Sequence, residues 1–237
     1  MSKSKGTSVT PDEVAQRYGA DTLRLYILFE APFEDTIQWS EERLNGTFRF
    51  LNRLWTTVLG IVATEGEPDP SLDGEARKLR RVHHQTIAKV SEAIDNLRFN
   101  TAVSGLMILL DHMRKFVSAG GAAHPAAREA ADGLVRLLAP MAPHIADELH
   151  ARLGGSAPLY RGPWPIADPE LAAEDEVEVV VQVNGKLRDR LAMPAGSDAA
   201  TMEAAALALA KIAAEITGKT VRKVVVVPGR LVNIVAN

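Results

Sequence analysis

The spacing of apolar residues changes once along this 237-residue chain, and the change decides what the chain can fold into. Up to residue 155, apolar side chains recur every three or four residues, which is the spacing of amphipathic helices. From Val177 to Val183 valine occupies every second position, and Asn184-Gly185 then supplies the signal for a type I′ turn between two strands. The sequence therefore predicts a mainly α protein, in which a helical bundle is followed by a separate small α+β domain.

Polar side chains are placed to cap several of the predicted helices at their amino ends. Thr10 is the best defined, because proline follows it and Glu13 stands three residues beyond, which together form a capping box. Ser40 follows Trp39, which is placed to pack onto Leu44 in the next helix. We therefore expect helices to begin after four N-cap residues, which are Thr10, Asp21, Ser40 and Asn100.

The last third of the chain is expected to have its own fold. After the first hairpin, an alanine-rich helix is predicted from about residue 197 to 216, followed by strands over 221–227 and 231–235. The order β-β-α-β-β describes an α+β domain of roughly 60 residues. Four prolines between residues 156 and 175 indicate a linker, which Trp164 is expected to anchor onto the bundle. The predicted boundaries are 21–155 for the bundle, 156–175 for the linker and 176–237 for the small domain.

Composition removes several classes of function. The longest apolar runs are too short to span a bilayer, so no membrane partner is expected, and no secretory signal opens the chain. The absence of cysteine excludes disulfides and thiolate zinc sites, and it fits a cytoplasmic location. The six histidines form no convincing ligand set, so no metal site is predicted. No phosphate-binding loop, dinucleotide fingerprint or nucleophile-elbow motif is present either.

A formal net charge of −3 conceals two basic stretches. Residues 77–115 carry eight Lys/Arg against three acids, and residues 180–237 carry eight against four. Local excesses of this kind can hold phosphates even on an acidic chain, provided that the side chains cluster in space. On charge alone, solvated helix and strand faces are the simpler interpretation.

The amino end carries a stretch suited to polyphosphate. Two lysines and two serines stand in Met1-Ser2-Lys3-Ser4-Lys5-Gly6, and an ammonium group can follow phosphate oxygens as charge develops on a leaving pyrophosphate. Together with segments 9–11 and 17–24, this stretch resembles the signature loop of the class I aminoacyl-tRNA synthetases and the helices behind it. Residues 1–20 are therefore interpreted as a remnant of that catalytic loop with the helix that follows it.

Segments further along narrow the resemblance to the C-terminal part of the bacterial leucyl-tRNA synthetases. Segments 37–40 and 46–55 are similar to the leucyl enzyme, while 98–103 and 138–145 resemble the anticodon-binding-type helical domain shared with the isoleucyl and valyl enzymes. The tail resembles the C-terminal domain of the bacterial leucyl enzyme over three segments, which are 181–188, 218–224 and 227–235.

The resemblance assigns roles to the signature loop. Met1, Ser2, Lys3 and Ser4 would contact ATP, and Lys3 would help to stabilise the transition state of adenylate formation in the parent enzyme, which uses ATP and Mg²⁺. The nucleotide-binding fold and the editing domain of that family lie upstream of the matched segments. We therefore expect Lys3 to be non-functional in the isolated chain, which should bind no cofactor and have no aminoacylation activity.

The resemblance also implies partners, namely tRNA-Leu and the catalytic and editing domains of the same parent chain. The bundle should meet the inner side of the L-shaped tRNA, and the small domain its outer corner. The expected tRNA contacts are five residues of the small domain and three weaker candidates in the bundle: Lys186, Arg188, Lys219, Arg222 and Lys223, with Arg80, Arg81 and Arg98. Arg98 is as well placed to satisfy carbonyls at the end of the preceding helix. Arg222 and Lys223 would point to opposite faces of a regular strand, so at most one of them need face RNA.

Two other functions fit the same residues. The chain could be a free-standing RNA-binding protein descended from a synthetase tail, although its remnant of the catalytic loop argues against this. It could instead be a protein-interaction scaffold whose basic residues are merely solvated. In that case binding would not respond to salt, because no phosphate contact would release counterions.

Overall fold

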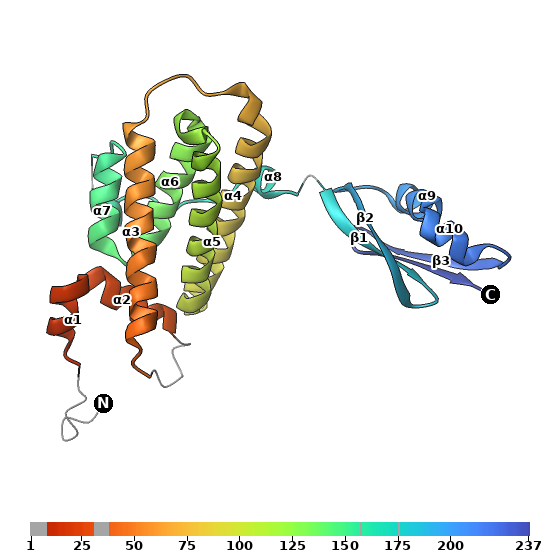
Figure 1. The fold of residues 1–237 in the computed structure, drawn as a ribbon, viewed down its shortest axis with the longest axis horizontal. Helices are drawn as coiled ribbons and strands as arrows, with labels where there is room; N and C mark the ends of the chain where they lie inside the picture. The colour runs from red at the N-terminus through yellow and green to blue at the C-terminus, as the bar shows by residue number, and fades with distance from the viewer. Residues whose placement is uncertain (1–8, 31–37, 157, 175) are drawn as a thin grey trace. The chain divides into compact units, whose positions relative to one another are not determined.

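A computed structural model describes residues 9–30, 38–156, 158–174 and 176–237 of the chain. The chain divides into two compact units, Met1–Ala172 and Ala173–Asn237 (Figure 1). The division falls inside the segment 156–175 that the sequence suggests as a linker. No helix within the described ranges is long and apolar enough to cross a membrane. The mainly α fold class with a small α+β unit is confirmed.

The first unit is a bundle of long helices with a short helical pair at one end. Helices α3 to α6 run side by side, and α1 and α2 lie at one end of α3 (Figure 1). The helices are α1 (Pro11–Tyr18), α2 (Ala20–Glu30), α3 (Glu41–Ala63), α4 (Asp73–Asp95), α5 (Phe99–Ser118), α6 (Pro125–Leu138) and α7 (Pro143–Arg152).

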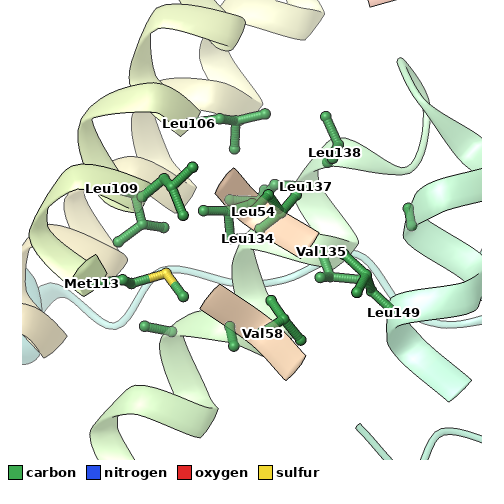
Figure 2. Close-up of a cluster of buried hydrophobic side chains, with 14 of the residues drawn as sticks. Leu54, Val58, Leu106, Leu109, Met113, Leu134, Val135, Leu137, Leu138 and Leu149 are labelled. Atoms are coloured by element: carbon green, nitrogen blue, oxygen red, sulfur yellow. The ribbon is translucent and has the colours of Figure 1, made fainter. Parts of the chain in front are cut away.

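The core of this unit forms where α3, α5, α6 and α7 meet. The side chains that converge there are fully buried (Figure 2). Each such leucine contributes about 1.5–3 kcal/mol relative to an exposed position, so this layer is a large part of what holds the helices together. Its members include Leu54 and Val58 of α3, Leu106, Leu109 and Met113 of α5, Leu134, Val135, Leu137 and Leu138 of α6, and Leu149 of α7.

Two of the four predicted N-caps are confirmed. Thr10 Oγ1 accepts from the backbone N–H of Glu13 at 3.4 Å, and the Glu13 carboxylate accepts from the Thr10 N–H at 3.2 Å, which completes the capping box. Ser40 Oγ accepts from the N–H of Arg43 at 3.3 Å. Trp39 and Leu44 share a small apolar cluster, as the predicted staple requires.

The other two predicted caps are wrong. Helix α2 begins at Ala20, so Asp21 lies inside its first turn, and its carboxylate is directed to another helix. Helix α5 begins at Phe99 because Leu97 adopts a left-handed backbone conformation that turns the chain sharply after α4. Arg98 therefore occupies the N-cap position, and Asn100 is already helical.

The segment that follows α7 packs along the outside of the bundle. Trp164 is confirmed as an anchor, because its indole N–H donates to Ser91 Oγ of α4 at 2.8 Å. The backbone N–H of Asp168 donates to His84 Nδ1 at 3.0 Å. The side chain of Gln85 donates to the carbonyl of Ala172 at 2.9 Å, at the end of the short helix α8 (Pro169–Ala172). Much of the proline-bearing segment therefore belongs physically to the first unit.

The second unit is a four-stranded sheet with helices on one face. The strand order is β2-β1-β4-β3, with β1 and β4 parallel and the outer pairs antiparallel. Asn184 and Gly185 both have positive φ, as the predicted type I′ turn requires. The elements are β1 (Glu176–Val183), β2 (Lys186–Pro194), α9 (Ala199–Ala208), α10 (Ala210–Ile216), β3 (Val221–Val227) and β4 (Leu231–Ala236).

The single helix predicted from residue 197 to 216 is two helices. Leu209 is extended, with ψ of 125°, and separates α9 from α10. Each half buries its own side chains against the sheet, Met202 and Ala206 from α9 and Ile212 from α10. The break thus lets both halves follow the surface of the sheet.

Candidate nucleic-acid interface

The residues that the resemblance assigns to ATP are Met1, Ser2, Lys3 and Ser4. All four lie outside the described residues, so their predicted roles remain predictions.

The fold brings the five predicted basic residues of the small unit to one end of its sheet. The β1–β2 turn is tied to the end of β4, where Asn184 exchanges two hydrogen bonds of 2.8 and 3.0 Å with the backbone of Ala236. The start of β3 reaches the same end, because the Thr220 N–H donates to the Asn237 carbonyl at 2.8 Å. Residues 186–188 and 219–223 therefore flank one rim, on edge strands three strand spacings or about 14 Å apart.

Two of these five cations have no partner among the described residues, and the other three are engaged. Lys186 and Lys223 are exposed and make no side-chain hydrogen bond or ion pair within the ranges that the structure describes. Arg188 and Lys219 share the carboxylate of Glu215, at 3.0 and 4.0 Å. Exposed ion pairs of this kind contribute only about 0–1 kcal/mol, so a phosphate can replace the carboxylate at small cost.

The register of β3 shows which face of the sheet carries Lys223, and it shows that Arg222 does not follow the regular strand pattern. Lys223 pairs with Val235, and this face of the sheet is open to solvent, since Val225, Val227 and Val235 are 37–39% exposed. A register shift between Val221 and Lys223 places Arg222 in a bulge, where the alternation of a regular strand does not apply. Arg222 Nε donates to Asn237 Oδ1 at 2.9 Å. Lys223 is thus available on the open face.

The bundle candidates are engaged within the chain. Arg80 of α4 forms a two-pronged pair with Glu129 of α6, at 2.7 and 2.9 Å, and this hydrogen-bonded pair lowers the pKa of the Glu129 carboxyl. The Arg98 guanidinium donates to the Glu92 carboxylate at 2.9 Å, and the backbone N–H of Arg98 donates to the Ala93 carbonyl at the end of α4 at 2.7 Å. Arg81 is half-buried and also interacts within the chain. Arg80 therefore joins two helices, and it is a weaker RNA candidate than Lys186 or Lys223.

Sequence reasoning omitted three exposed cations of the small unit from the candidate contacts, and two of them, Arg190 and Lys211, form ion pairs with Glu178 and Asp189. Arg230 lies in the β3–β4 turn, and its guanidinium has no partner among the described residues. The parallel register of β1 with β4 puts this turn at the end of the sheet opposite to Lys186. Arg230 lies in segment 227–235 that carries the resemblance, but its place in the sheet follows only from the strand pairing.

A pair of opposite charges on α2 holds the junction between α6 and α7. Both Asp21 carboxylate oxygens are used, Oδ2 accepting from the Ile145 N–H at 2.7 Å and Oδ1 lying 2.8 Å from His144 Nδ1. Arg24 donates to the carbonyls of Met141 and Pro140 at 3.3 and 3.2 Å. The Asp21 carboxylate thus binds at the amino end of α7, and the Arg24 guanidinium binds carbonyls just after the carboxyl end of α6. Helix dipoles favour both arrangements. These contacts connect the two sequence segments 17–24 and 138–145.

A buried histidine lies deeper in the bundle, between α4 and α6. His83 is 7% exposed, and its Nε2 has no hydrogen-bond partner. Burial lowers the pKa of His83 to about 4, with the neighbouring His84 acting in the same direction. The ring is therefore neutral near pH 7 and acts as a packing group.

Comparisons with known proteins agree with this architecture. Residues 76–203 match the family model described as the anticodon-binding domain of tRNA ligase, and residues 1–53 match the model described as tRNA synthetases class I (M). Among solved structures, the chain is similar to LeuRS in the ternary complex of Agrobacterium radiobacter K84 agnB2 LeuRS-tRNA-LeuAMS, with a TM-score of 0.85 and 26% identity. That match covers 100% of this chain and 31% of the LeuRS chain, so the chain spans about a third of its relative's length.

The first of these family models covers more than half of the chain, from α4 through the β1–β2 hairpin and into α9. The chain therefore belongs to the family of tRNA ligases that carry this anticodon-binding domain.

Proposed function

We propose that this chain is the tRNA-holding portion of a leucyl-tRNA synthetase, with tRNA-Leu as its partner. The observation that carries the proposal is the clustering of five sequence-predicted cations at one end of the small unit, two of them without an intramolecular partner in the described part of the chain. The family match and the likeness to a LeuRS structure that contains tRNA support it.

In this proposal the complete ligase performs its reaction in the cytoplasm, in two steps. Leucine and ATP, with Mg²⁺, give leucyl-adenylate and pyrophosphate, and the tRNA 3′ end then takes the leucyl group. The catalytic and editing domains of the same parent chain perform the chemistry. The residues described here hold the body of the tRNA through phosphate contacts, and they position it without touching the reacting atoms.

The proposal predicts which lysines carry binding. Lys186→Ala and Lys223→Ala should each weaken tRNA-Leu binding several-fold and lower the slope of log K against log salt by about 1, because each removes one phosphate contact. Arg230→Ala is the matched control, since it removes from the opposite end of the same sheet an exposed cation that has no partner among the described residues. Fluorescence anisotropy with labelled tRNA-Leu at several salt concentrations measures these changes. An Arg230→Ala variant as weak as the lysine variants would contradict a localised contact, and salt-insensitive binding would favour a protein-interaction scaffold.

A second prediction concerns catalysis. The purified 237-residue chain should form no leucyl-tRNA from leucine, ATP, Mg²⁺ and tRNA-Leu, because a single signature-loop lysine cannot by itself position the reactants. Incorporation of radiolabelled leucine into acid-precipitable tRNA measures this, with a complete leucyl-tRNA synthetase as positive control. Leucyl-tRNA above the level of a no-protein blank would overturn this part of the proposal.

A further inference from the structure

A hollow lies between the α6–α7 junction and residues 159–165 of the proline-bearing segment. Its volume is about 350 Å³, within the range of roughly 300–1,000 Å³ that is typical of small-molecule sites. The tRNA contacts proposed above involve none of its residues. Apolar side chains form much of its lining, namely Ala139, Pro140, Pro143, Leu159, Pro163 and Pro165.

Polar contacts and prolines hold the walls of this hollow in place. The Leu159 N–H donates to Asp147 Oδ1 at 2.9 Å, and the Trp164 indole N–H donates to Ser91 Oγ at 2.8 Å, so the segment is fixed to the bundle at two points. Proline has a fixed φ, so the four prolines of the lining have little freedom to lose when a ligand binds. The hollow is therefore preformed, which lowers the entropic cost of binding.

A guanidinium with unused donors belongs to the lining. The side chain of Arg136 on α6 is only 26% exposed, and its Nε donates to Asp132 Oδ2 at 2.7 Å. Its Nη1 and Nη2 have no hydrogen-bond or ion-pair partner within the described ranges. This free edge of the guanidinium has the geometry to bind both oxygens of a carboxylate.

Gly162 leaves that edge of Arg136 accessible. Its φ and ψ are −82° and 164°, an extended conformation that any residue adopts, so its backbone does not require glycine. A Cβ at this position would lie 3.4 Å from Arg136 Nη1 and 3.4 Å from the Leu159 carbonyl oxygen. The absence of a side chain at Gly162 therefore keeps open the space beside the guanidinium.

A carboxylate and two aromatic rings complete the described lining. Asp147 uses Oδ1 for the Leu159 N–H, and its Oδ2 has no partner in the part of the chain that the structure describes. Tyr160 and Trp164 are 76% and 39% exposed, so their rings are accessible to an apolar ligand. An anion alone would be repelled by Asp147 and a cation alone by Arg136, whereas a zwitterion is attracted to both.

We propose that this hollow binds a free α-amino acid with an aromatic side chain. The Arg136 guanidinium donates to the α-carboxylate, and the α-ammonium donates to Asp147. The side chain packs against Trp164 and the prolines of the lining. Because the ligand is small and stays partly exposed, we expect a Kd on the order of 1 mM. This site is independent of the proposed tRNA-holding role and goes beyond it.

Titration of the whole chain with L-phenylalanine tests the site, with the ¹H–¹⁵N signal of the Trp164 indole as the local readout. This signal is the one missing from the spectrum of Trp164→Phe. It should shift saturably with L-phenylalanine, while the indole signals of Trp39 and Trp55 stay in place. No saturable shift up to about 20 mM L-phenylalanine would overturn the site.

Two analogues of phenylalanine test whether both charges are recognised. Phenethylamine lacks the carboxylate and N-acetyl-L-phenylalanine lacks the ammonium, so each should bind at least tenfold more weakly than L-phenylalanine. Phenethylamine that binds as tightly would show an apolar hollow without a carboxylate site. N-acetyl-L-phenylalanine that binds as tightly would indicate the carboxyl end of a peptide as the ligand. Either result would overturn a free amino acid.

Charge variants locate the binding groups. Arg136→Gln and Asp147→Asn should each weaken L-phenylalanine binding at least fivefold, and the Asn variant keeps an oxygen acceptor for the Leu159 N–H. Arg152→Gln is the matched control, because Arg152 also pairs with an acid one helical turn before it, Glu148, but lies outside the lining. Equal losses in Arg136→Gln and Arg152→Gln would contradict the assignment of Arg136.

A variant of unchanged charge tests the space beside Arg136. Gly162→Val should weaken L-phenylalanine binding at least tenfold, because its side chain enters the space next to Nη1. It should change the Tm by no more than about 1 °C, because extended backbone accommodates valine. Unchanged binding in Gly162→Val would refute the site. All these variants should bind tRNA-Leu as the unaltered chain does, so failure of this inference leaves the proposed function standing.

Discussion

Gly133→Ala should lower the free energy of unfolding of the helical unit by about 3 kcal/mol. A Cβ on Gly133 would lie 1.8 Å from Nε2 of His83 and 2.8 Å from two other atoms of the same ring. The ring is buried between α4 and α6, so it has no free space into which it can turn. Urea unfolding followed by circular dichroism at 222 nm measures the loss, because most of the helical signal comes from this unit.

The effect of Gly133→Ala on the free energy of unfolding should disappear or change sign once the imidazole ring of His83 is removed. In a His83→Ala background the added methyl meets no imidazole, and alanine is the better helix former by about 1 kcal/mol. Gly133→Ala should then be neutral or stabilising, which a double-mutant cycle reports as a coupling of about 3 kcal/mol or more. If Gly133→Ala had the same effect in both backgrounds, the close packing of ring on glycine would be disproved.

Asp21→Ala should lower the free energy of unfolding by about 2–3 kcal/mol. The substitution removes the anion from the start of α7 and leaves the Ile145 N–H without its acceptor in a partly buried site. Asp21→Asn should be milder, because an amide oxygen can still accept from Ile145. Thermal and urea unfolding of both variants, beside the exposed-site control Asp111→Ala, measure the effect. A loss no larger than that of the control would show that this contact does not hold the α6–α7 junction.

Features with short-range partners were predictable from the sequence. The caps at Thr10 and Ser40 use bonds that span three residues, and the Asn184-Gly185 turn is a two-residue pattern, so both are visible in a local window. The four strands of the small unit followed from alternating valines in the same way, although the helix predicted between the two hairpins is divided at Leu209. The resemblance of the tail then selected the five basic residues that the fold gathers at one end of the sheet.

Features with distant partners were not predictable. Asp21 has the composition of an N-cap, but its partner Ile145 lies 124 residues away, so only the packed bundle shows which helix it serves. Arg222 looked like part of a regular strand until the register shift placed it in a bulge. Arg80 looked like a free cation, and its pairing with Glu129 depends on α4 packing beside α6.

A salt titration of binding tests whether this chain holds the body of tRNA-Leu. The unaltered chain is titrated into labelled tRNA-Leu and into a tRNA with a short variable arm, from about 50 to 200 mM salt. This role predicts tighter binding to tRNA-Leu than to the other tRNA, and an affinity that falls as salt rises, with a slope of log K against log salt of about −2 or steeper. Absent binding, or an affinity that does not change with salt, would contradict it.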